Sequence, residues 1–453
     1  MNENTKLLLA SFSLGGVIFL SVHIFGQLLH INDSEARLTS LGIPKVLPLD
    51  ATKGEQKVIM NDPSIQKNWG LAGTGGTSDI KVGNAWDITK GDRRIVVAVI
   101  DTGADIKHSD LADNIWRNAG ETGKDANGKD KATNGIDDDN NGYIDDVYGW
   151  DFVNNNNNVV DNHGHGTHIS GIIGAVGGNG IGISGVCPKV SLMILKYFDP
   201  KSKGNDNLKN TVRAIRYAVD MGANIINYSG GGTDPNDDEF AAIKYAEDKG
   251  VLVVAAAGNE HSNSDIAHYY PADYNLSNII SATAIDTFAK VLRSSNYGTK
   301  TVHIAAPGEG IYSTLPGGNY GLMTGTSQAT AFVSGVAALI LSHNKEFSAE
   351  QVKKQIVATA DELPGLRDKT ISGGKLNSYA ALAIQPSIPA TGIAVASRNG
   401  SVGIIGVHSR KGASTAGQEE TGDSSGESID LSGLIKAINR PLAGLPSSEK
   451  IHN

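Results

Sequence analysis

Two serines in this sequence have neighbours that could make a hydroxyl group nucleophilic. Ser424 is the centre of a Gly-x-Ser-x-Gly pattern in "TGDSSGES" (421–428), and Ser327 lies near the start of "GTSQATAFVSGVAALILSH" (325–343). A serine hydroxyl attacks a carbonyl carbon efficiently only when a base takes its proton, commonly a histidine that a carboxylate orients. The serine that does chemistry must therefore have such partners and a rigid element to hold it.

Ser424 lacks this support. A nucleophile in a Gly-x-Ser-x-Gly pattern depends on a strained turn between a strand and a helix. Residues 391–430 contain fifteen Gly or Ser and no run that could form a buried strand or helix. We interpret the pattern at Ser424 as fortuitous, and we expect residues 386–453 to be a low-complexity, mostly disordered C-terminal tail.

Ser327 has partners elsewhere in the sequence. "VVAVIDTGAD" (96–105) places Asp101 directly after a buried strand, and "DNHGHGTHISG" (161–171) places histidines among glycines before an apolar helical stretch. Taken alone, Asp101 could be a turn residue and Ser327 a helix N-cap. Taken together, the three segments supply a carboxylate, a base and a nucleophile.

These segments resemble the blocks of the subtilisin-like serine proteases (subtilases), in the family's order of Asp, His and Ser. The resemblance covers roughly residues 61–385. By matching position it implies that Asp101 orients the imidazole, His165 is the general base and Ser327 is the nucleophile. His163 is then expected to be a loop residue, and His168 a packed residue of the helix.

The resemblance also implies an oxyanion hole and a substrate groove. Asn259 ends the apolar run "VVAAAGNE" (253–260), where the family supplies a side-chain amide donor. An extended peptide is expected to add as a strand along "NYSGGG" (227–232). One wall of the primary pocket would be formed by Ser229, Gly230 and Gly231, and the other by Ala256 and Gly258. Small residues in both walls predict a wide pocket for apolar or aromatic side chains.

The elements that must position these residues follow from hydrophobic periodicity. Continuously apolar runs predict strands that are buried on both faces, at 93–100, 191–198, 223–229, 251–258 and 278–285. Between them lie amphipathic helical patterns, such as 207–222. Alternating strands and helices predict an α/β fold with a largely parallel sheet and helices on both faces. The resemblance makes this the three-layer subtilisin-like fold.

An acidic segment, "NGIDDDNNGYIDDVYGWDF" (134–152), has the spacing of a calcium loop. Oxygen ligands at alternate positions and a glycine at the sixth place reproduce the first nine positions of such a loop. The twelfth place is Tyr148 instead of Glu, so the bidentate ligand must come from elsewhere. The alternative is a solvated acidic loop. The candidate ligands are Asp137, Asp139, Asn141, Asp145 and the carbonyl of Tyr143.

A second calcium site is implied only by the resemblance. Its candidate ligands match positions at which many subtilases hold calcium: Asp62, Asp110, Asn179 and the carbonyls of Ile181 and Ile183.

The N-terminal segment predicts export. Residues 7–29 contain no Asp, Glu, Lys or Arg, and this length suits a membrane span. Residues 1–30 are therefore either an uncleaved signal anchor, which we favour, or a signal peptide whose removal secretes the protein. Residues 31–60 would be a short linker or a vestigial pro-segment, too short for a packed pro-domain. Either the enzyme folds without a pro-domain or the chain is an atypical branch of the family, and the sequence leaves self-processing open.

Composition excludes several classes of protein. The chain has 453 residues, a net charge of −9 and one cysteine. A phosphate-binding surface is disfavoured, and so is an internal disulfide framework. The sequence predicts an exported, calcium-stabilised serine endopeptidase, monomeric, with protein or peptide substrates and no nucleic-acid partner. The alternatives are a catalytically silent scaffold that binds peptides and a calcium-dependent surface module.

Overall fold

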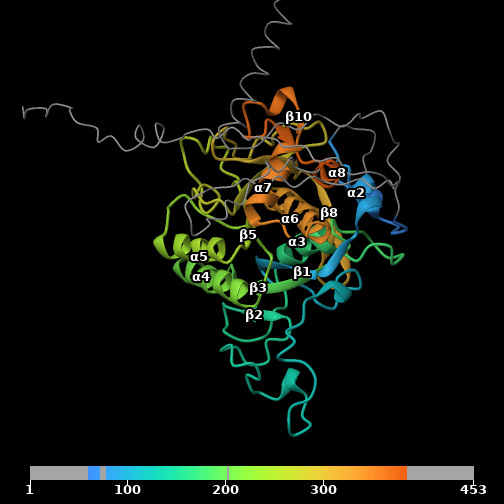
Figure 1. Cartoon of the computed structure of the whole chain (residues 1–453), viewed down its shortest axis with the longest axis vertical. Helices are drawn as coiled ribbons and strands as arrows, with labels where there is room; N and C mark the ends of the chain where they lie inside the picture. Colours follow the sequence, from blue (N-terminus) through green and yellow to red (C-terminus); the bar gives the residue numbers. More distant parts are fainter. Residues whose placement is uncertain (1–59, 72–77, 201–203, 385–453) are drawn as a thin grey trace, which may run out of the picture. The chain divides into compact units, whose positions relative to one another are not determined.

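The computed structural model of the chain describes residues 60–71, 78–200 and 204–384. Within them, nine strands form one sheet in the order β10-β11-β7-β6-β5-β4-β1-β3-β2 (Figure 1). All neighbouring strands run parallel except the pair β10–β11. The strands are β1 (Gly91–Asp101), β2 (Gly149–Asp151), β3 (Lys189–Lys196), β4 (Ile225–Tyr228), β5 (Leu252–Ala256), β6 (Ile279–Ile285), β7 (Ile304–Pro307), β10 (Asp361–Glu362) and β11 (Gly374–Lys375).

The central strands are buried on both faces, as their uninterrupted apolar sequences predict. In β1, Val97 and Val99 belong to one hydrophobic core, whereas Ala98 and Ile100 belong to a second core on the opposite face. The five strands predicted from the sequence all occur, with ends that differ by two residues at most. The α/β fold with a largely parallel sheet is confirmed.

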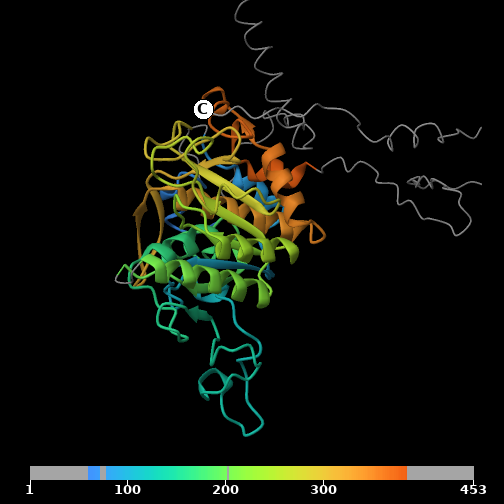
Figure 2. The same ribbon diagram turned by 90° about the vertical axis from the view of Figure 1, so that its left-hand side faces the viewer.

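Helices cover both faces of the sheet (Figures 1 and 2). The first face carries α3 (His165–Gly174) and α6 (Thr326–His343), and the second carries α4 (Gly204–Asp220) and α5 (Asp237–Asp248). Nearly every residue of α6 is buried, which is why its sequence is apolar all round. The remaining helices are α2 (Val82–Ile88), α7 (Ala349–Ala358), α8 (Ser378–Ala383) and the 3₁₀ turns Ile65–Lys67, Ala112–Asn114, Lys131–Thr133 and Pro364–Leu366. A separate hairpin pairs β8 (Ile311–Leu315) with β9 (Asn319–Met323).

The strand order reverses at β1, which pairs with β3 on one side and with β4 on the other. In open parallel sheets, ligands bind at such a switch point, beyond the carboxyl ends of the strands. Asp101 ends β1, Ser229 follows β4, and Asn259 lies three residues after β5. The fold therefore gathers three of the predicted site residues at one edge of the sheet.

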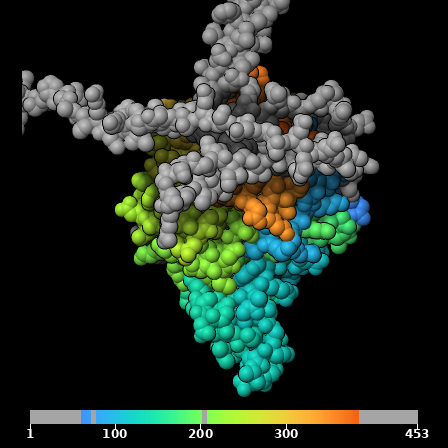
Figure 3. All heavy atoms as spheres, in the orientation of Figure 1, coloured from blue at the N-terminus to red at the C-terminus, as the bar shows by residue number. Residues whose placement is uncertain are grey.

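The long connection between β1 and α3 contains little regular structure. Its acidic part (teal) projects beyond β2 in the ribbon views and in the space-filling view (Figures 1–3). No helix of the described segments has the length and hydropathy needed to cross a membrane. The predicted signal segment (1–30), the predicted linker (31–60) apart from residue 60, the tail at 386–453 and Ser424 lie outside the described residues.

Candidate active site

His165 and Asp101 are in direct contact. The Nδ1 atom of His165 lies 2.7 Å from Oδ1 of Asp101. Asp101 is the buried last residue of β1, whereas His165 begins α3 with 25% of its side chain exposed. Because Nδ1 faces the carboxylate, Nε2 is the ring nitrogen that can exchange a proton with another group.

Opposing effects set the pKa of His165. Burial of the imidazole lowers the pKa, but the charge and hydrogen bond of Asp101 raise it, and the charge of Asp161 raises it further. The pKa of the ring is therefore raised above the usual value of 6.5. A ring with these neighbours is a stronger base than an isolated imidazole.

Asp161 is a residue that the sequence reasoning missed. Its buried carboxylate accepts from the backbone N–H groups of His163 (2.9 Å) and Gly164 (2.8 Å), directly before α3. It also accepts from the hydroxyls of Thr102 (2.9 Å) and Thr167 (2.6 Å), and from the N–H of Thr167 (2.9 Å). The loop before His165 is thereby fixed to the residue after Asp101. The signal in the sequence is an acidic residue just ahead of a helix N-terminus.

Gly166 allows α3 to approach the end of β1. A Cβ atom at this position would stand 2.1 Å from the carbonyl oxygen of Gly103 and 3.1 Å from Cβ of Asp101. Any side chain would push the helix away from the strand. The glycine therefore keeps His165 within reach of Asp101.

Ser327 lies in the first turn of α6 and is buried, 8% exposed. Its hydroxyl donates to the carbonyl of Ser229 at 3.2 Å. The neighbouring Thr326 donates its N–H to Oδ1 of Asn259 at 3.0 Å. Because Oδ1 of Asn259 accepts this hydrogen bond, Nδ2 of the same side chain is the atom that can donate to a bound group.

The predicted walls of the substrate groove lie beside these residues. Ser229 and Gly230 are half-buried, Gly231 is exposed, and Ala256 and Gly258 are buried. The space beside Gly230 is occupied, because a Cβ there would stand 2.1 Å from the hydroxyl oxygen of Tyr197. Beyond Asn259 a cavity of about 650 Å³ opens, lined also by Glu260, His261, Leu292, Arg293, Ser294, Glu309 and Thr324.

The other histidines of the block are placed as loop and packing residues. His163 is exposed in the loop before α3. His168 is fully buried, with Nε2 2.9 Å from the carbonyl oxygen of Ile311. Burial lowers the pKa of His168 to about 4, so the ring is neutral at physiological pH. Cys187 is also buried and free, and burial raises the pKa of its thiol to about 12, which keeps it unreactive.

A comparison with protein-family models decides the family. The model described as the subtilase family matches residues 92–381. The chain belongs to the subtilase family. It is a subtilisin-like, serine-type endopeptidase, as predicted from the Asp, His and Ser blocks.

Individual relatives agree with this placement. The subtilase is 36% identical to the protein named thermitase of Thermoactinomyces vulgaris over 307 residues, which is 68% of this chain and 95% of the relative. It is 35% identical over 298 residues to a thermophilic serine proteinase of Bacillus sp. (strain AK1), covering 66% of this chain and 64% of the relative. A solved structure of a protease from Pseudoalteromonas arctica aligns with a TM-score of 0.55 and 25% identity, covering 72% of this chain and 98% of that one.

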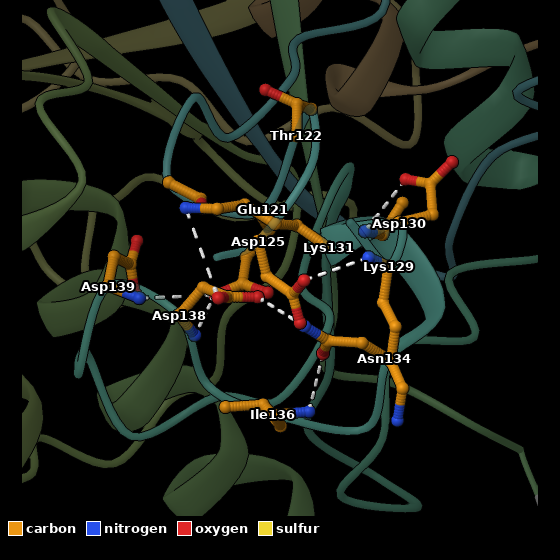
Figure 4. Close-up of polar contacts among 12 residues, drawn as sticks. Glu121, Thr122, Asp125, Lys129, Asp130, Lys131, Asn134, Ile136, Asp138 and Asp139 are labelled. Carbon is orange, nitrogen blue, oxygen red and sulfur yellow. Dashed lines mark hydrogen bonds and ion pairs between the residues drawn. The ribbon is translucent and has the colours of Figure 1, made fainter. Parts of the chain in front are cut away.

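The acidic segment (134–152) and Glu121, which precedes it, bring together carboxylates that could hold a metal ion. Oxygen atoms of Glu121, Asp137 and Asp139 all lie within 4.8 Å of one another. Glu121 is fully buried, and its Oε1 accepts from the backbone N–H groups of Asp138 (2.7 Å) and Asp139 (3.3 Å), as Figure 4 shows. Its Oε2 is buried without a hydrogen-bond partner. Burial, opposed by these two hydrogen bonds, raises the pKa of Glu121, and the charge of Asp139 raises it further.

Glu121 was not among the predicted ligands, and the predicted ligands differ in their surroundings. Asn141 donates its backbone N–H to Asp137 (3.1 Å) and Asp139 (3.2 Å), so it belongs to the cluster. The ring of Tyr143 packs on Trp150 and Tyr217. The backbone N–H of Tyr143 donates to the side-chain oxygen of Asn141. Asp145 differs, because its carboxylate accepts from the N–H of Gly135 at 3.2 Å and does not join the carboxylate cluster.

The residues of the second predicted calcium site also lie together. Asp62 and Asp110 are both buried. Asp62 accepts from the N–H groups of Gly178 and Asn179, whereas Asp110 accepts from the amide of Asn179 (2.9 Å) and the N–H of Ile183 (2.8 Å). Ile181 follows in the same loop and donates its N–H to Asn179. The pKa of Asp62 is raised, by burial first and in addition by the charge of Asp110.

Proposed function

We propose that Asp101, His165 and Ser327 form the catalytic triad of this endopeptidase. The contact of 2.7 Å between His165 and Asp101 is the observation that carries the proposal. The position of Ser327 at the buried start of α6 is the second support. Its hydroxyl contacts the carbonyl of Ser229, and the preceding residue, Thr326, contacts Asn259. The three proposed triad residues come from three separate segments, β1, α3 and α6, and each has a role in acyl transfer through a serine.

The proposed reaction proceeds through an acyl-enzyme. Oγ of Ser327 attacks the carbonyl carbon of the peptide bond while Nε2 of His165 takes its proton. The negative oxygen that forms accepts hydrogen bonds from Nδ2 of Asn259 and from the backbone N–H of Ser327. The carbon–nitrogen bond then breaks as His165 gives its proton to the leaving amine. Water repeats the attack with the same base, which releases the acid product and restores Ser327.

The substrate would bind as an extended strand beside Ser229, Gly230 and Gly231, with Ala256 and Gly258 on the other side of its side chain. Such binding uses main-chain hydrogen bonds, so it suits unfolded or flexible protein segments. The chain would act as a monomer, since each proposed catalytic group is its own.

Calcium is proposed at two places, in both cases as a structural ion. In the acidic segment, Glu121 supplies the ligand that position twelve of the loop lacks, together with Asp137, Asp139, Asn141 and the carbonyl of Tyr143. The buried Oε2 of Glu121, which has no partner, fits an ion that prefers carboxylate oxygens. Asp145 is not part of this ligand set. The second set is Asp62, Asp110, Asn179 and the carbonyls of Ile181 and Ile183, where both carboxylates are buried. Burial first, and the charge of Asp110 in addition, raise the pKa of Asp62.

Export, with membrane anchoring through residues 7–29, is proposed from the apolar character of that segment. Removal of the segment would instead secrete the protein. N-terminal sequencing of the purified protein distinguishes the two outcomes.

Labelling with a fluorophosphonate tests the proposed nucleophile. The wild-type protein should be labelled, and Ser327→Ala should lose both labelling and casein hydrolysis. Ser424→Ala is the matched control, because it removes the other serine with a nucleophile-like pattern and should be labelled like wild type. Loss of labelling in Ser424→Ala, or its retention in Ser327→Ala, would contradict the assignment.

A further inference from the structure

The space between the two walls of the substrate groove contains the ring of Tyr269. We infer that Tyr269 makes this subtilase selective for small side chains, of the size of Gly, Ala or Ser, on the residue that contributes the scissile carbonyl. The inference rests on the proposed catalytic function and adds the substrate class to it. It replaces the wide pocket for large apolar side chains that the sequence predicted.

The two walls of the groove begin beside Ser327 and Thr326. One wall is tied to Ser327, since the carbonyl of Ser229 accepts from its hydroxyl at 3.2 Å. The other wall is tied to the adjacent residue, since Oδ1 of Asn259 accepts from the N–H of Thr326 at 3.0 Å. A side chain next to the attacked carbonyl must therefore enter between the segments 229–231 and 256–259.

The ring of Tyr269 lies against a glycine of each wall. A Cβ atom on Gly231 would stand 2.5 Å from Cε1 of Tyr269, and a Cβ atom on Gly258 would stand 2.9 Å from Cδ2 of the same ring. Cε1 and Cδ2 are diagonally opposite corners of a tyrosine ring. The ring thus spans the distance from one wall to the other, and both walls are glycine at the points of contact.

Hydrogen bonds hold the backbone that carries the ring. The N–H of Tyr269 donates to the carboxylate of Asp273 at 2.9 Å, and its carbonyl accepts from the N–H of Asp273 at 3.0 Å. The next residue, Tyr270, pairs with Gly232 through two backbone hydrogen bonds of 2.7 and 2.9 Å. The backbone that carries the ring is therefore held within its own turn by Asp273, and the next residue is paired with Gly232, which follows the groove wall.

The chemistry of the filled pocket follows from these contacts. An aromatic or long aliphatic substrate side chain would have to displace the ring, whereas a side chain of one or two heavy atoms would need far less of the space that the ring takes up. Burial, followed by the charges of Glu260 and Glu239, raises the pKa of Tyr269 to about 12, so its hydroxyl stays neutral. A neutral hydroxyl can donate a hydrogen bond to a serine side chain without selecting for charge.

Peptides that differ only at this residue test the inference. With internally quenched peptides containing Ala or Phe there, the wild-type protein should show a kcat/KM at least about 10-fold higher for Ala, the size of effect that pocket-filling groups produce. Tyr269→Gly should reduce or reverse this ratio by at least about 10-fold. Tyr269→Phe, which keeps the ring and removes the hydroxyl, should retain the preference for Ala.

Several results would overturn the inference. Equal cleavage of the Phe and Ala peptides by the wild-type protein would overturn it, and this result needs no variant. The inference would also be overturned if Tyr269→Gly is labelled by the fluorophosphonate but keeps the wild-type ratio of kcat/KM for the Ala and Phe peptides. If that variant fails to fold, Tyr269→Ser serves in its place. Absence of labelling in wild type would contradict the proposed function, whereas full labelling without selectivity contradicts only the role of Tyr269.

Discussion

The hydroxyl of Thr102 donates to the carboxylate of Asp161 at 2.9 Å, and this bond joins the end of the Asp101 strand to the start of the His165 helix. Four further donors converge on the same buried carboxylate, from His163, Gly164 and Thr167. The contact between Asp101 and His165 therefore depends on a second carboxylate that touches neither of them by a hydrogen bond. Asp161 is a positioning residue in this arrangement.

Substitution Asp161→Ala should destabilise the protein by at least about 2 kcal/mol, because it leaves several buried donors without an acceptor and each costs about 1–3 kcal/mol. It should also shift the acidic limb of the pH–activity profile to lower pH, since the charge of Asp161 raises the pKa of His165. Denaturant unfolding and kcat/KM against pH measure the two effects. Asp113→Ala, at an exposed carboxylate, should change neither. If the pH–activity profile of Asp161→Ala is not shifted from that of wild type, Asp161 has only a structural role and does not affect the pKa of His165.

Substitution Asp101→Asn should lower kcat by about 10⁴, the loss known for this change in a serine protease of unrelated fold. The wild-type activity should rise with pH through a pKa above 6.5, because His165 acts as a base only when it is neutral and its pKa is raised. Removing the carboxylate removes the largest effect that stabilises the charged ring, so the pKa of His165 should fall. The rise of the residual activity with pH should therefore occur at a lower pH than in wild type. Rate measurements between about pH 5 and 9 check the sign. A limb at the same or a higher pH in Asp101→Asn would contradict the proposed pairing.

Substitution Asn259→Ala should lower kcat by about 10²–10³ with little change in KM, since an oxyanion forms only in the transition state. That magnitude is the loss known for removing the corresponding side-chain donor in another member of this family, about 10²–10³ in kcat. Asn259→Asp is the informative partner variant, because it retains the oxygen that accepts from Thr326 but lacks the Nδ2 donor. Steady-state kinetics should show a loss in both variants. Full activity in Asn259→Asp would assign Asn259 to holding Thr326 only.

Chelation should lower the thermal unfolding midpoint of the wild-type protein if calcium occupies the proposed sites, because an ion that binds only the folded state stabilises it by mass action. Substitution Glu121→Gln should reduce the gain from added calcium. In chelator the same variant should be at least as stable as wild type, because it removes one charge from a cluster of carboxylates. Asp130→Asn, at an exposed carboxylate in the same insertion, is the matched control. A midpoint that chelator leaves unchanged would contradict both sites.

A comparison of predicted and observed elements shows what local sequence specifies. The runs around Val97 and Val254 are apolar at every position, so they had to be strands buried on both faces. The helix that begins at Thr326 is apolar on all sides, which suits burial against the sheet. Parallel connectivity then placed Asp101 and Asn259 at one edge of the sheet.

The same reasoning could not find Glu121, Asp161 or Tyr269. Glu121 meets Asp137 and Asp139 only through the path of an irregular loop, and Asp161 acts through bonds to residues on both sides of a long insertion. The ring of Tyr269 lies beside both Gly231 and Gly258, and Gly231 is distant from Tyr269 in sequence. No periodicity encodes such meetings.

The sequence by itself therefore determined the strands and helices, their parallel order and the identity of the Asp, His and Ser blocks, because hydrophobic periods and short motifs are local properties. The tertiary structure alone decided which ring lies beside Gly231 and Gly258, which carboxylate joins Asp137 and Asp139, and which carboxylate fixes the loop before His165. Those outcomes depend on contacts between distant segments, and the conformations of the loops that bring them together are not written in any local pattern.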